Sequence, residues 1–271
     1  MNKIAIFGVP RSGTSWLSQI FNSHPDVVLR FQPLFSYGHK GSLTANSTAG
    51  NIRKFFDEIL YTQDSFALMS SEMQKNYPTF KKSASPTHIA FKETRYMHII
   101  ENILSQCSEI KIIGIVRDPL AVLASWVSAP KEYNSEWDIS FEWREAPSKN
   151  ESRPEEFYGF NKWKEVAEQF LYFERRYPEQ FILVKYVDLN KAPLDVATRM
   201  FTFCDLEVCD QVQEFILESK SRHDSDPYSV YRSNAEDGNW EGILPDQIVQ
   251  QVMLELKNTP LEVFLQDMMN A

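Results

Sequence analysis

The stretch that most constrains this chain is residues 3–21, KIAIFGVPRSGTSWLSQIF. It opens with four consecutive apolar residues and turns through a segment rich in glycine and serine. It then places apolar side chains at helical spacing: Trp16, Leu17, Ile20 and Phe21. A short apolar run favours a buried strand, and spacings of three and four favour a helix. The start of the chain therefore predicts a strand, a tight loop and a helix in immediate succession.

The loop at residues 8–15 is close to the phosphate-binding pattern GxxxxGK[ST]. Gly8 and Gly13 stand at the glycine positions, Thr14 replaces the lysine, and Arg11 supplies a basic residue inside the loop. Backbone N–H groups at a helix start attract anions. Hydroxyl side chains add further donors: Ser12, Thr14 and Ser15. We expect this loop to hold a phosphate-like group, and the missing lysine argues against an ordinary ATPase or GTPase.

A length of 271 residues is compatible with one large domain or two small ones, and we interpret the chain as one. The net charge of −9 disfavours binding to nucleic acid or to anionic membranes. Three cysteines form no metal-ligand spacing and no even disulfide set, which indicates a reducing, cytoplasmic location. The first strand starts almost at Met1, so we expect no signal peptide, and no apolar run approaches the roughly 20 residues of a membrane span.

Strand and helix patterns alternate along the chain. Strands are expected at residues 4–7, 27–29, 88–92, 110–116 and 181–186. Helices are expected at 14–21, 51–60, 94–104, from 119 onward, and at 158–177, 194–203, 210–219, 245–257 and 261–269. This order predicts an α/β fold of three layers, with a central, mostly parallel sheet of about five strands flanked by helices.

Two segments are weakly patterned, and we interpret both as variable substrate-recognition segments within the single domain at 1–271. Residues 34–87 are polar and contain a loop at 36–50 that we expect to be mobile. Residues 129–157 are too polar for a core and too aromatic for a linker. Trp137 and Trp143 either form part of a lid, the interpretation we favour, or anchor the segment. The aromatic faces expected at 158–177 and 261–269 belong to the core or to a homodimer contact.

A second candidate anion site follows the strand expected at 110–116. Ligands of open α/β sheets sit beyond the carboxyl ends of the strands. Arg117 stands at that end, and Ser125 follows eight residues later on the next helix. A guanidinium can grip a phosphate with two hydrogen bonds. Two anion sites at neighbouring strand ends suit a nucleoside that carries phosphates at both ends.

At this point the chain resembles the sulfotransferases that use 3′-phosphoadenosine 5′-phosphosulfate (PAPS). The segment from Pro10 to Trp16, PRSGTSW, resembles that family's 5′-phosphosulfate loop. VRDP at 116–119, with Ser125 and Trp126, resembles its 3′-phosphate motif. YVDL from Tyr186 resembles a later strand-end segment, although Val187 departs from the usual acid. YRS at 231–233 with Trp240 is similar to the segment that closes over the nucleotide, through Arg232.

The resemblance implies transfer of a sulfuryl group from PAPS to a hydroxyl or amine of a small-molecule, glycan or lipid acceptor. The implied donor-binding residues are those of the first loop with Trp16, Arg117, Ser125, Tyr186 and Arg232. Charge builds on the leaving phosphate oxygen, and a fixed Arg11 guanidinium would stabilise it. Lys92, at the end of a neighbouring strand, is a second candidate cation. This route uses no metal, and the sequence contains no metal-ligand cluster.

The proton acceptor is harder to identify. Related sequences carry a Glu in a segment like FEP, where this chain has Gln32, which cannot act as a base. Others carry a His in KTH, where this chain has Thr94. Glu93 and His39 are the remaining candidates, with Glu93 ranked first.

Two other classes stay open. A nucleotide kinase would need a basic residue at the phosphates and a Mg²⁺ site, and Thr14 in place of lysine argues against it. A non-catalytic nucleotide-binding protein would bind the donor without turnover, and the replacements at Gln32 and Thr94 keep it under consideration.

Overall fold

The computed structural model describes residues 1–69, 77–224, 226, 228–231 and 240–265. Its centre is one sheet of five strands in the order β2-β3-β1-β4-β5, and every neighbouring pair is parallel. The strands are β1 (Asn2–Phe7), β2 (Val27–Phe31), β3 (His88–Glu93), β4 (Ile110–Val116) and β5 (Phe181–Lys185). The predicted sheet is confirmed, and β4 has the bounds that its apolar run indicated.

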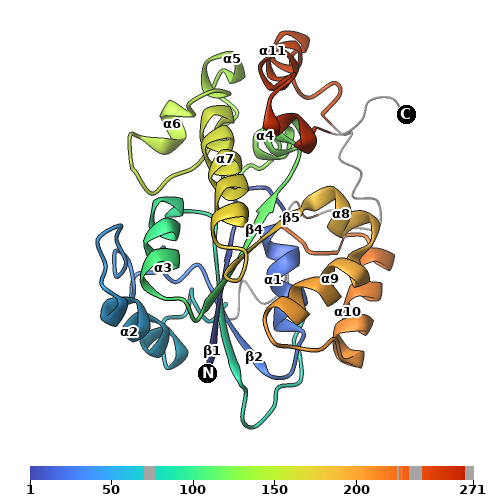
Figure 1. The fold of residues 1–271 in the computed structure, drawn as a ribbon. Coiled ribbons are helices and arrows are strands. Elements are labelled where there is room, and N and C mark those ends of the chain that lie inside the picture. Colours follow the sequence, from blue (N-terminus) through green and yellow to red (C-terminus); the bar gives the residue numbers. More distant parts are fainter. Residues whose placement is uncertain (70–76, 225, 227, 232–239, 266–271) are drawn as a thin grey trace.

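Helices cover both faces of this sheet (Figure 1). On one side lie α1 (Thr14–Asn22), α8 (Tyr186–Lys191), α9 (Pro193–Phe203) and α10 (Asp210–Ser221). On the other lie α2 (Ala49–Leu60), α3 (Ile100–Gln106), α4 (Pro119–Val127), α7 (Phe160–Arg176) and α11 (Asp246–Leu256). Shorter elements are η2 (Met97–Ile99), α5 (Ile139–Glu142), α6 (Pro147–Asn150) and η3 (Pro260–Phe264).

The alternation of side chains along each strand divides the core in two. In β1, Ile4 and Ile6 face α1, whereas Ala5 and Phe7 face the cluster that contains α2 and α3. Successive residues of a strand point to opposite faces. Because both faces are covered, the middle of each central strand is apolar: residues 4–7 in β1, 89–91 in β3 and 112–116 in β4.

The strand order places the candidate loops side by side. After β1 the chain first forms β2 and β3, which lie on one side of β1 in the strand order. It then crosses β1 to form β4 and β5 on the other side. Phe7 near the end of β1 pairs with Gly114 in β4. The carboxyl ends of β1 and β4 are therefore neighbours at the point where the strand order reverses, which is where open α/β sheets bind ligands.

Two helix predictions need correction, and one helix was not predicted. The helix expected at 94–104 begins later, because Tyr96 has a φ of 60° and its backbone N–H donates to Glu155 O at 3.1 Å. A helix cannot run through that conformation. The chain forms a further helix, α8, directly after β5. At 261–269, the described part forms the 3₁₀ turn η3, and residues 266–271 lie outside the described range.

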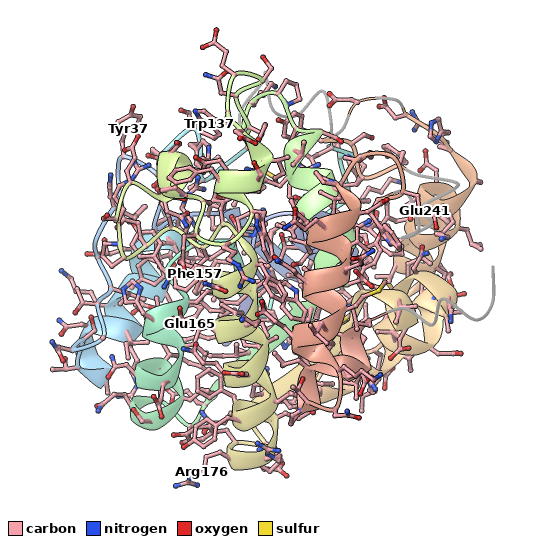
Figure 2. All side chains as sticks on the ribbon, turned by 90° about the horizontal axis from the view of Figure 1, so that it is seen from above. Tyr37, Trp137, Phe157, Glu165, Arg176 and Glu241 are labelled. Carbon is pink, nitrogen blue, oxygen red and sulfur yellow. The ribbon has the colours of Figure 1, made fainter. Side chains whose placement is uncertain are left out.

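The segment at 129–157 contributes to the core, contrary to its polar composition. Tyr133, Trp143 and Phe157 are all buried, and Figure 2 shows Phe157 inside the molecule and Trp137 near its edge. Trp143 stacks on Phe160 with ring centres 5.6 Å apart. Trp143 therefore anchors the segment and is no part of a lid over the cleft.

Candidate active site

A cleft of about 640 Å³ opens at the carboxyl ends of β1, β3 and β4. Most of the predicted site residues line it: Arg11, Gly13, Thr14, Ser15, Trp16, Lys92, Arg117, Ser125 and Tyr186. Ser12 is buried beneath the loop and does not line the cleft, and its hydroxyl has no hydrogen-bond partner among the described residues. Arg232 lies outside the described residues.

The loop at 8–15 owes its shape to its two glycines. Gly13 has a φ of 90°, and a Cβ there would lie 2.5 Å from the ring of Tyr186. A Cβ on Gly8 would lie 2.7 Å from the carbonyl oxygen of Ile115. Only glycine allows both the left-handed turn and these close approaches. The loop thus ends at the N-terminus of α1, whose N–H groups favour an anion.

Arg11 is held over the cleft by neighbours that are distant in sequence. Its backbone is left-handed, with a φ of 72°. Its Nε donates to Ser125 Oγ at 3.0 Å, and its Nη1 lies 3.4 Å from Glu132 Oε1. The guanidinium also lies over the ring of Tyr228, 5.3 Å from the ring centre. Ser125 was predicted to belong to the same anion site as Arg117, and it accepts a hydrogen bond from Arg11 of the first loop.

Arg117 connects the two candidate anion sites. Its Nη1 donates to the backbone oxygen of Arg11 at 3.1 Å, and its guanidinium lies 4.6 Å from the centre of the Tyr186 ring. The next residue, Asp118, caps α4 by accepting hydrogen bonds from the N–H groups of Leu120 and Ala121. Both guanidinium groups therefore face one cleft from adjacent strand ends, as the sequence predicted.

Two aromatic residues form the wall beside the loop. Trp16 and Tyr186 are mostly buried and meet edge to face, with ring centres 6.3 Å apart. The indole N–H of Trp16 donates to Ser219 Oγ at 2.9 Å. Both residues belong to the core cluster around α1 and also line the cleft, so Trp16 packs in the core and still presents a surface to the cleft.

Lys92 provides a further cation at the end of β3. Its Nζ lies 3.5 Å from Ser15 Oγ and 4.4 Å from the centre of the Phe31 ring. Burial lowers the pKa of Lys92 to about 7. An anion in the cleft would stabilise the charged form, so bound phosphate favours the ammonium.

Neither predicted base faces the cleft. Glu93 is fully buried, and its Oε1 accepts a hydrogen bond from the Leu34 backbone at 2.7 Å. Burial raises the pKa of Glu93 to about 8. His39 lies within hydrogen-bond distance of Thr62 Oγ1, at 2.8 Å, and packs near Phe55. Neither residue is among those that line the cleft.

The cleft wall near the ends of β2 and β3 contains residues that were not singled out from the sequence. Arg95 makes two 2.9 Å contacts to the carboxylate of Glu156, and it donates to Gln32 Oε1 at 3.1 Å. Its guanidinium stacks on Phe35, 4.0 Å from the ring centre. Arg95 directly follows the segment Lys92-Glu93-Thr94, and that position was the available signal. Gln32 is thereby fixed at the cleft wall, where it can orient an acceptor.

Glu132, Lys149 and Tyr158 also line the cleft. The first two lie in the 129–157 segment interpreted as substrate-recognising, but none of the three was singled out from the sequence. Among the described residues, no group of three or more His, Cys, Asp or Glu is placed to hold a metal ion. No described helix combines the length and the apolar composition needed to cross a bilayer.

Comparison with protein families identifies the family of this chain. Residues 3–210 match the model of the sulfotransferase family. The chain belongs to that family. The resemblance drawn from PRSGTSW and from Arg117 with Ser125 is confirmed, and the nucleotide-kinase alternative is not favoured.

Individual relatives are distant. The chain is 20% identical to carbohydrate sulfotransferase 3 of Tetronarce californica, over 92% of this chain and 70% of that protein. It is 27% identical to human carbohydrate sulfotransferase 3, over 53% of this chain and 31% of the human protein.

Two solved structures share the fold. Mouse sulfotransferase SULT7A1, solved in complex with PAP, is 14% identical with a TM-score of 0.55, and the match covers 97% of this chain and 87% of that one. The sulfotransferase domain from the curacin biosynthetic pathway is 16% identical with a TM-score of 0.51, covering 95% of this chain and 98% of that domain. These matches confirm the three-layer α/β fold with a central parallel sheet.

Proposed function

We propose that this sulfotransferase uses PAPS as donor and transfers its sulfuryl group to a hydroxyl or amine. The observation that carries the proposal is the contact between the two anion sites, in which Arg117 Nη1 donates to the Arg11 backbone at 3.1 Å. A donor with a 5′-phosphosulfate and a 3′-phosphate can span these two guanidinium groups. PAP in the related mouse structure supports this choice of nucleotide.

The proposed roles follow from the positions of the charges. The loop at 8–15 and the start of α1 hold the 5′-phosphosulfate, and Arg117 holds the 3′-phosphate. Arg11 and Lys92 stabilise the charge that develops on the leaving phosphate oxygen, since fixed cations in a shielded site need no rearrangement during reaction. Trp16 and Tyr186 flank the nucleoside.

The acceptor enters from the side formed by the two weakly patterned segments. Phe35 and Phe66 from 34–87, and Lys131 and Lys149 from 129–157, line that side. Small-molecule, glycan and lipid acceptors all remain proposals, and the carbohydrate sulfotransferase relatives favour a glycan. A cytoplasmic location and a homodimer stay predictions from the sequence.

Titration calorimetry with PAP tests the donor assignment. We expect PAP to bind without added metal and more tightly than ATP–Mg²⁺. Absence of PAP binding, or tighter ATP–Mg²⁺ binding, would contradict the proposal. A screen of acceptors with ³⁵S-labelled PAPS then separates an enzyme from a non-catalytic nucleotide-binding protein, which would bind PAP and release no label.

A further inference from the structure

The cleft contains a carboxylate for which neither the motifs nor the family assignment accounts. Among the described residues that line it, Glu132 is the one acid, and no histidine is present. The other candidates for a base are held elsewhere: Glu93 is buried against the Leu34 backbone, and His39 contacts Thr62. Gln32 has no basic group. Glu132 is therefore the candidate proton acceptor among the described residues of this cleft.

The backbone holds Glu132 firmly at the cleft wall. Its N–H donates to Ala129 O at 2.8 Å, and its own carbonyl accepts from the Trp126 indole at 3.2 Å. Trp126 is buried in the core. The start of the 129–157 segment is thus tied to the end of α4, and the side chain projects into the cleft from a fixed point.

The two oxygens of Glu132 face the two halves of the site. Oε1 lies 3.4 Å from Arg11 Nη1, the cation of the donor loop. Oε2 accepts a hydrogen bond from Tyr158 Oη at 3.1 Å, and Lys149 lies over that tyrosine ring. The carboxylate therefore stands at the junction between the phosphosulfate loop and the acceptor side, and 21% of its side chain is exposed.

We propose that Glu132 is the general base that takes the proton of the acceptor hydroxyl. This inference rests on the proposed function. The acceptor oxygen attacks sulfur, its O–H bond breaks, and the proton passes to a Glu132 oxygen. The bond between sulfur and the bridging oxygen breaks, and its electron pair stays on the 5′-phosphate of PAP beside Arg11. The protonated carboxyl then releases the proton to water.

Tyr158 and Arg11 hold this carboxylate in its orientation through the contacts to its two oxygens. The titratable groups that act on Glu132 come from several elements: Arg11, Tyr77, Lys92, Lys149, Tyr158 and Tyr228. A general base acts only in its unprotonated form, so the wild-type rate should decline toward acid pH.

Hydrolysis of ³⁵S-labelled PAPS, with water as the acceptor, tests the role without a known substrate. Glu132→Gln keeps the shape and removes the basic group. We expect its release of labelled sulfate to fall about 100- to 10,000-fold, as for loss of a general base. The decline toward acid pH should disappear, while PAP binds no more weakly. Glu132→Ala should regain activity when formate is added, which a merely structural role would not produce.

The matched control is Glu136→Gln, an exposed acid of the same segment, which should hydrolyse PAPS like the wild type. The proposal is wrong if Glu132→Gln hydrolyses PAPS at the wild-type rate, or if the wild type hydrolyses it no faster than buffer. It is also wrong if the decline of PAPS hydrolysis toward acid pH persists in Glu132→Gln and disappears in Lys92→Met. Failure of the wild type to bind PAP would instead reject the proposed function itself.

Discussion

The substitution Gly13→Ala tests how the first loop is built. It introduces two separate costs at one position. The left-handed backbone, with a φ of 90°, costs a residue with a Cβ about 1–2 kcal/mol. The new Cβ would also lie 2.5 Å from the Tyr186 ring, and overpacking of this kind costs about 1–3 kcal/mol. Together they should lower the free energy of unfolding by about 2–5 kcal/mol.

Two other glycines separate these contributions. Gly41 has a φ of 71°, and a Cβ there would meet nothing within 4 Å, so Gly41→Ala should show only the backbone cost of about 1–2 kcal/mol. Gly114 lies in β4, and its Cβ would meet Phe181 at 2.5 Å without left-handed strain. Gly114→Ala should therefore show only the packing cost, about 1–3 kcal/mol.

Urea unfolding with linear extrapolation measures each free energy, and calorimetry with PAP measures the donor site. Because the Arg117 guanidinium lies over the Tyr186 ring, displacement of the ring in Gly13→Ala should also weaken PAP binding. Gly114→Ala should leave that affinity nearly unchanged. Our account of the loop is refuted if Gly13→Ala is no more destabilising than Gly41→Ala, or if it binds PAP like the wild type.

Three further predictions concern charges. Arg11→Ala should chiefly lower the turnover of PAPS, whereas Arg117→Ala should chiefly weaken PAP binding, as steady-state kinetics and calorimetry would show. Glu93 has a pKa of about 8 in the folded protein and its ordinary value of 4.5 in the unfolded chain. The free energy of unfolding should therefore decrease as the pH rises from 4.5 to about 8. Urea unfolding of Glu93→Gln should lack that fall. Glu156→Ala leaves the mostly buried Arg95 without its carboxylate and should cost about 3–5 kcal/mol in urea unfolding.

A specific result would contradict each of these three predictions. Equal and small effects of the two arginine substitutions would contradict their separate roles. A fall in stability of the same size in Glu93→Gln would assign the pH dependence to another group. For the buried ion pair, the control is Glu109→Ala, whose exposed pair with Arg53 should contribute less than about 1 kcal/mol. An equal cost for both pairs would contradict the argument from burial.

The cleft lining contributed by the first loop and by the end of β4 could be predicted because its information is local. The loop at 8–15 is a contiguous motif, and Arg117 and Ser125 are fixed by one strand end and the helix that follows it. Alternation of strands and helices then implied a parallel sheet, which brings the carboxyl ends of its strands to one edge. The same reasoning placed Lys92 and Tyr186 at that edge.

The acceptor half could not be predicted in this way. Glu93 directly follows Lys92, yet it is buried behind the cleft because successive residues of a strand point to opposite faces and its neighbour takes the cleft side. Trp143 was assigned to a lid on composition alone, whereas a stacking contact with Phe160 draws it into the core.

The sequence by itself determined the fold class, the phosphate loop and the pair of arginines, since each depends on residues close together in the chain. Only the tertiary structure decided which acid faces the cleft. Glu132 meets Arg11 across 121 positions of sequence and Tyr158 across 26. Such contacts arise from the packing of α4 and the 129–157 segment against the sheet, and no local periodicity encodes them.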